Sequence, residues 1–212
     1  MTTVADLLRS KERTTEACAS RERQSGVARV SLILIALGGA AFGAAVGSYR
    51  GSLQLGTSAL KLPLVTLFTL ALSGPAFFAL ATAFGRRWSF RQALALVLAA
   101  GARSSLVLLA LSPVLALVVD LGAGYEGVRW AALVAYGLGG LSALSLMITA
   151  LGPSRGRVSV LMAFGAVFLV IGAQAAWLGR PYLGDPRDRD VPMFAHGRRE
   201  GGLLGALLTP RS

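Results

Sequence analysis

Long apolar segments alternate with short polar ones along the whole chain. Five apolar segments reach about 20 residues, the length that a helix needs to cross about 30 Å of hydrocarbon. The expected spans are Val27–Val46, Leu62–Phe84, a stretch within Gln92–Val119, Trp130–Leu151 and Val158–Leu178. The pattern therefore predicts an all-α fold, a polytopic integral membrane helical bundle of about five transmembrane helices.

Polar segments at the two ends divide the chain into three parts. We expect residues 1–26 to form a short polar arm with a helical pattern, 27–179 the transmembrane domain, and 180–212 a polar tail. The first apolar segment begins too far along the chain for an ordinary signal peptide, so it is expected to remain as a span. Five spans do not divide into two equal halves, as inverted-repeat transporters do.

Basic residues are unevenly distributed between the two sides that five spans create. The N-terminal segment and the loops 85–91 and 152–157 hold eleven, whereas the intervening loops hold three, Arg50, Lys61 and Arg129. The positive-inside rule therefore predicts a cytoplasmic N-terminus in the cell inner membrane. The C-terminal tail, with six basic and four acidic residues, is then expected outside.

Composition agrees with this interpretation and removes several classes of function. The chain is 54% hydrophobic and 15% charged, whereas soluble domains carry about a quarter charged residues. Its net charge of +11 favours contact with lipid head groups over nucleic acid, because no basic run alternates with aromatic residues. One cysteine, Cys18, and one histidine, His196, exclude an intrachain disulfide and multi-residue Cys or His metal sites. We therefore expect no metal and no cofactor.

Arg103 is the only charged residue in the third apolar segment, and Ser104 and Ser105 follow it. A charge at the bilayer centre is costly and marks a candidate functional site. If the span begins near Ala99, Arg103 lies about a turn inside the cytoplasmic edge and reaches the head groups, which we favour. If it begins at Gln92, Arg103 lies near the midplane and needs a partner. No span supplies a carboxylate, so that partner would be a backbone carbonyl, a Ser or Gln side chain or an external anion.

Glycines at helical spacing predict close contacts between helices. Gly39, Gly43 and Gly47 are four residues apart in the first span and share one face. Gly137 and Gly140 form a second candidate packing stretch in the fourth span. The alternative is that these positions only reflect a chain rich in alanine and glycine.

A proline in the second span predicts a kink, and polar or aromatic residues mark other positions. Pro75 lies two residues after Ser73 and removes a backbone hydrogen-bond donor, so we expect a kink there. Proline kinks are common in membrane helices, and they also occur beside the substrate sites of transporters. Gln174 lies near the end of the fifth span. The expected interface anchors are Trp88, Trp130, Trp177, Arg180 and Tyr182.

Two stretches carry a resemblance to a known family. Residues 49–78, YRGSLQLGTSALKLPLVTLFTLALSGPAFF, and the late GAQAAWLGRPYLGDP resemble a bacterial family of uncharacterised multi-span membrane proteins, some labelled "actin-binding WH2 domain-containing". The layout is also loosely similar to Yip1-like membrane proteins. The matching residues are Tyr49, Gly51, Gln54, Lys61, Pro63, Pro75, Gln174, Trp177, Arg180, Pro181, Gly184, Pro186 and Phe194. The resemblance implies no chemistry, and the Leu60-Lys61 pair lies where no actin filament can dock.

The inventory of reactive groups decides between the classes of function. The spans contain no carboxylate pair, no Ser-His-Asp set and no phosphate-binding loop, so we do not expect an enzyme. We expect a non-catalytic assembly or scaffold subunit that acts through helix packing and its tails. Its expected partners are the lipid bilayer and a second copy or another membrane subunit. The alternative is a channel or transporter subunit for an anion or small solute, which would use the Pro75 kink and Arg103.

Overall fold

A computed structural model describes residues 10–50, 52–153 and 156–179, and every regular element in these ranges is helical. Five of the helices are long and apolar enough to cross a membrane, so the predicted all-α bundle of about five spans is confirmed. The elements are α2 (Lys11–Ala19), α3 (Gln24–Gly47), the 3-10 turn η1 (Ser48–Arg50), α4 (Ser52–Ala83), α5 (Phe90–Asp120), α6 (Tyr125–Leu151) and α7 (Arg157–Gly179).

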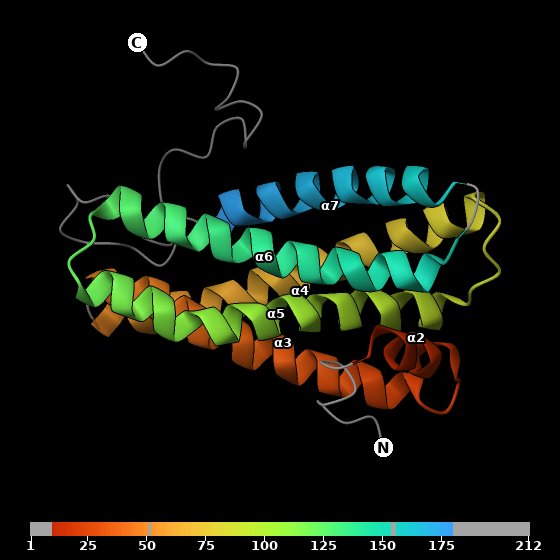
Figure 1. Ribbon diagram of the computed structural model, residues 1–212, viewed down its shortest axis with the longest axis horizontal. Coiled ribbons are helices and arrows are strands. Elements are labelled where there is room, and N and C mark those ends of the chain that lie inside the picture. The colour runs from red at the N-terminus through yellow and green to blue at the C-terminus, as the bar shows by residue number, and fades with distance from the viewer. Residues whose placement is uncertain (1–9, 51, 154–155, 180–212) are drawn as a thin grey trace, which may run out of the picture.

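The long helices run side by side and reverse direction at each connection (Figure 1). Helix α3 packs on α4 and α5, α6 packs on α5, and α7 packs on α4. More than half of the most apolar window is buried in α3 and α5, against 22% in α6 and 17% in α7. Helices α3 and α5 therefore form the centre of the bundle. The outer faces carry exposed apolar side chains such as Leu141 and Met162, which suits contact with lipid.

Two helices begin earlier than hydropathy predicts. Helix α4 begins at Ser52, ten residues before the expected Leu62, and α6 begins at Tyr125, five before Trp130. Lys61 was expected in a loop, and that expectation is wrong, because Lys61 lies within α4 and is only 4% exposed. The polar residues of this first part of α4 are buried against neighbouring helices, so a hydropathy pattern places them outside the span.

The glycines of α3 bring its backbone close to α4. A methyl group at Gly39 would lie 3.0 Å from the Cα of Pro63, and one at Gly47 would lie 2.6 Å from the Cα of Leu55. At Gly43 it would overlap the carbonyl of Ser58. The glycine face of the first span is therefore a contact within this chain, where any side chain would separate the two helices.

A different glycine provides the close contact on α6. A methyl group at Gly139 would lie 2.7 Å from Oγ of Ser104 on α5, whereas no atom of the described chain lies within 4 Å of a methyl group at Gly137 or Gly140. Gly137 and Gly140 are exposed. They therefore do not pack against another helix of the bundle.

The basic segments meet at one end of the bundle, where α2 and the α4–α5 and α6–α7 connections lie (Figure 1). Arg86 donates to the carbonyl of Leu151, and Nη1 of Arg157 donates to the carbonyl of Gly152 at 3.4 Å. Both carbonyls lie at the C-terminal end of α6, where cations are favourable because the helix dipole is negative there.

Candidate functional site

The N-terminal arm is part of the bundle. Its helix α2 begins after Ser10, whose hydroxyl accepts a hydrogen bond from the backbone N–H of Arg13 at 3.2 Å. Helix α2 packs against α3, α5 and α6, and Thr14 and Cys18 on its inner face are fully buried. Nε2 of Gln24 donates to the carbonyl of Cys18 at 2.9 Å, which fastens the end of α2 to the start of α3.

Burial of the arm changes the chemistry of its cysteine. Desolvation raises the pKa of the Cys18 thiol to about 12, because the thiolate would lose its hydration in this contact. The thiol is therefore protonated at neutral pH while α2 is docked, and it is a poor nucleophile.

Arg103 interacts with the arm. It lies 13 residues beyond Phe90, the first residue of α5, which places it about 20 Å along that helix. The carboxylate of Glu12 on α2 lies within electrostatic interaction distance of the Arg103 guanidinium. An acidic residue outside the spans therefore contributes to the electrostatic environment of Arg103. The sequence could not reveal it, because nothing in the pattern of residues 11–19 places α2 beside α5.

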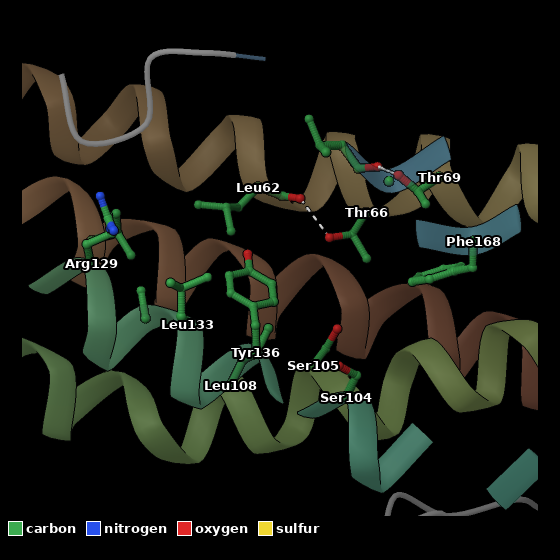
Figure 2. Close-up of a pocket in the computed structure, with 15 residues that line it drawn as sticks. Leu62, Thr66, Thr69, Ser104, Ser105, Leu108, Arg129, Leu133, Tyr136 and Phe168 are labelled. Carbon is green, nitrogen blue, oxygen red and sulfur yellow. Dashed lines mark hydrogen bonds between the residues drawn. The ribbon is translucent and has the colours of Figure 1, made fainter. Parts of the chain in front are cut away.

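A cavity of about 440 Å³ lies between α4, α5, α6 and α7 (Figure 2). Ser104 and Ser105 of α5 line it, with Tyr136 of α6 and Phe168 of α7. Figure 2 shows Arg129 at one end of this lining and Phe168 at the other. The remaining lining residues are Val46, Leu62, Val65, Thr66, Thr69, Leu108, Ala132, Leu133, Gly140 and Gly172.

The two threonines that line this cavity use their hydroxyls within their own helix. The hydroxyls of Thr66 and Thr69 donate to the carbonyls four residues earlier, at 2.9 and 2.8 Å (Figure 2). Ser104 packs its hydroxyl against Gly139 of α6. The surface that the cavity presents to an occupant is predominantly apolar, with the hydroxyl-bearing side chains of Ser104, Ser105 and Tyr136 in its lining.

The end of the cavity at Arg129 has a different character. Nη1 of Arg129 donates to Oε1 of Glu126 at 3.1 Å in an ion pair that is partly exposed on both sides. Its guanidinium carbon lies 5.5 Å from the ring centroid of Trp130, within the range of a cation–π contact. The two residues form a charged and aromatic rim near the start of α6.

The other residues of the predicted intramembrane site are dispersed. Arg103, Ser73, Pro75 and Gln174 are not among the lining residues of the cavity. Ser73 is fully buried and donates to the carbonyl of Thr69, whereas Pro75 and Gln174 are exposed. Helix α4 continues through Pro75 to Ala83. Only Ser104 and Ser105 of the predicted set therefore share a cavity.

The predicted interface anchors have separate environments. Trp88 lies 5.9 Å from the ring of Phe77 and from the guanidinium carbon of Arg86, and Trp130 is 59% exposed. Trp177 lies in α7, but its side chain is outside the described residues, as are Arg180 and Tyr182.

Sequence reasoning missed the buried polar face at the start of α4. Gln54, Ser58 and Lys61 are 5%, 0% and 4% exposed, and Nε2 of Gln54 donates to the hydroxyl of Ser58 at 3.4 Å. The spacing of these residues, four and then three apart, is the signal that would have extended the helix toward the N-terminus.

No protein-family model, no curated protein and no solved structure matches the chain. Its function is therefore inferred from the contacts of its own residues.

Proposed function

We propose that this chain is a non-catalytic integral membrane protein of the cell inner membrane, with its N-terminus in the cytoplasm, that serves as an assembly subunit. The observation that carries the proposal is the position of Arg103. This charge lies near Glu12 of the docked arm and not on the wall of the cavity. A transport pathway needs polar groups along a continuous route, and Arg103, the one charge of this apolar segment, does not line the cavity through which such a route would pass.

The outer helices supply the surfaces for assembly. Only 22% and 17% of the apolar windows of α6 and α7 are buried, so most of their area faces lipid or a partner. The tight glycine contacts of α3 are used within the chain, so these outer faces are the available surfaces for a second copy or another membrane subunit.

A flux assay in proteoliposomes tests the proposal against the channel alternative. We expect the wild-type protein to conduct halide, nitrate and small neutral solutes no faster than protein-free liposomes. Arg103→Ala and the control Arg157→Ala should behave in the same way. A selective flux in the wild type that Arg103→Ala abolishes and Arg157→Ala preserves would contradict the assembly role.

The mass of the particle in native lipid nanodiscs gives the complementary measurement. We expect a particle heavier than one chain of 22.0 kDa plus lipid, which contains a second copy or another membrane subunit. A particle that is obtained without detergent and contains one chain and no other protein would contradict the role of an assembly subunit.

A further inference from the structure

The cavity is a gap in the side of the bundle. Helix α6 packs mainly on α5, and α7 packs mainly on α4, so α4 and α7 form one wall, α6 forms the other, and α5 lies between them. Gly140 on α6 is exposed and also lines the cavity. The cavity is therefore open at the level of the apolar spans, where its surroundings are lipid.

The dimensions of the cavity match one leaflet and one extended chain. Its lining on α6 runs from Arg129 to Gly140, which is about 17 Å of helix, close to half of the roughly 30 Å hydrocarbon thickness. A hydrocarbon chain is a single file of methylene groups, so one chain of that length can lie along a cavity of about 440 Å³.

The lining of the cavity is apolar along its length and charged at one end, as a phospholipid has an apolar chain and a charged head group. Leu62, Leu108, Leu133 and Phe168 contribute apolar surface to the interior, and the threonine hydroxyls are bonded to their own helix. At the mouth, Arg129 uses Nη1 for Glu126. A guanidinium carries five N–H donors, so donors remain for a phosphate.

We propose that this cavity binds one acyl chain of an anionic phospholipid from the leaflet on the Arg129 side, with the phosphate held by Arg129. Trp130 lies beside the head group at the interface, where aromatic side chains are favoured. The bound lipid fills the gap between α6 and the α4–α7 pair. This goes beyond the assembly role and does not depend on it, because a lipid can occupy the cavity of a monomer or of a subunit.

Filling the cavity tests for the acyl chain. Gly140→Leu puts a side chain into the cavity, and Gly137→Leu is the matched control, because both glycines are exposed on α6 and have no atom within 4 Å of an added methyl group. The purified chains are exchanged into micelles that contain phosphatidylglycerol, and retained lipid is counted by native mass spectrometry. We expect one retained lipid in the wild type and in Gly137→Leu, and at least a fivefold loss in Gly140→Leu.

Replacing the rim charge tests for the head group. Wild type should prefer phosphatidylglycerol over phosphatidylcholine by about fivefold, which corresponds to about 1 kcal/mol for one arginine near anionic lipid. Arg129→Gln should remove this preference while retaining one lipid. Glu126→Gln should increase it, because the carboxylate no longer competes for the guanidinium.

Several outcomes would overturn the proposal. The first is that Gly140→Leu retains as much lipid as the wild type, and the second is that both glycine variants lose lipid equally. The third is that Gly140→Leu changes its oligomeric state while it retains lipid, which would assign the cavity to a second copy. If Gly140→Leu loses helical circular dichroism, Ala132→Leu, which fills the same cavity from α6, replaces it with the same expectations. Absence of flux in liposomes bears on the assembly role alone.

Discussion

Electrostatic attraction to Glu12 offsets part of the desolvation of Arg103, a charge inside an otherwise apolar helix. Each charge lowers the cost of the other, because a cation in an apolar surrounding is tolerated when a carboxylate lies nearby. The same attraction favours the docked position of the arm helix α2. Its inner face is otherwise small, with Thr14, Ala17 and Cys18 as the buried residues.

Removing the Glu12 charge should loosen the arm. We expect Glu12→Gln to raise the rate of maleimide labelling of Cys18 about two- to fivefold, since exposed or partly exposed pairs contribute about 1 kcal/mol or less. Glu16→Gln on the same helix is the control, because Glu16 is exposed and lacks this interaction. Equal labelling in all three proteins would show that Glu12 does not hold the arm.

The pH dependence of the arm follows from Cys18. Its folded pKa of about 12 lies above the ordinary value of 9.0, so docking favours the protonated thiol. The contribution of Cys18 to docking is therefore complete below pH 9 and decreases as the pH rises from 9 toward 12. Amide hydrogen exchange of residues 11–19, corrected for the intrinsic rate, should increase over this window in wild type and much less in Cys18→Ala. An identical profile in the variant would exclude the thiol as the cause.

The packing of α3 on α4 and α5 depends on the absence of side chains. Gly38 faces the carbonyl of Ser105 on α5 in the same manner as Gly43 faces Ser58 on α4. One helix therefore contacts two neighbours at backbone distance, and α3 and α5 together form the centre of the bundle.

A methyl group on this face should separate the helices. We expect Gly43→Ala to lower the free energy of unfolding by about 1–3 kcal/mol, the usual cost of overpacking, as measured by denaturation in mixed micelles. Gly137→Ala should leave stability unchanged or raise it by up to about 1 kcal/mol, because alanine favours helix and this position is open. A stable Gly43→Ala protein would mean that the contact can relax without cost.

The five spans were predictable because a bilayer leaves few alternatives to an apolar helix for a chain of this composition. The starts of α4 and α6 were not, because Lys61 in α4 and Arg129 in α6 look like loop residues when only hydropathy is considered. Whether a polar residue is covered by a neighbouring helix depends on tertiary packing. The same limit applies to Gly139, which sequence alone does not distinguish from Gly137 and Gly140.

At the scale of the molecule, the candidate site was predictable only in part. Ser104 and Ser105 were singled out because they follow Arg103, and they line the cavity. The opposite wall comes from α4 and α7, which are remote in sequence from Ser104 and Ser105, so no local sequence pattern indicates the cavity. The packing of the arm was not predictable from a local pattern either, because it joins residues 11–19 to α5 and α6, which are remote in sequence.

The orientation of the bundle can be measured with single cysteines in a Cys18→Ala background. Arg87→Cys lies in the α4–α5 connection and Leu121→Cys in the α5–α6 connection, and both positions are exposed. Because the basic segments are at the Arg87 end, a membrane-impermeant maleimide should label Leu121→Cys in intact cells and Arg87→Cys only after lysis. The reverse pattern would place the N-terminus outside.

The location of α2 also sets the order of events during biosynthesis. Helix α2 leaves the ribosome before the five long helices, but it packs against α6, whose Leu146 and Leu151 belong to the same core cluster as Ala17 and Cys18. About 130 residues must follow before this contact exists, which takes on the order of ten seconds at usual rates of translation. During that interval the arm is open to chaperones and proteases, and its docking afterwards marks a chain whose fourth span has been inserted.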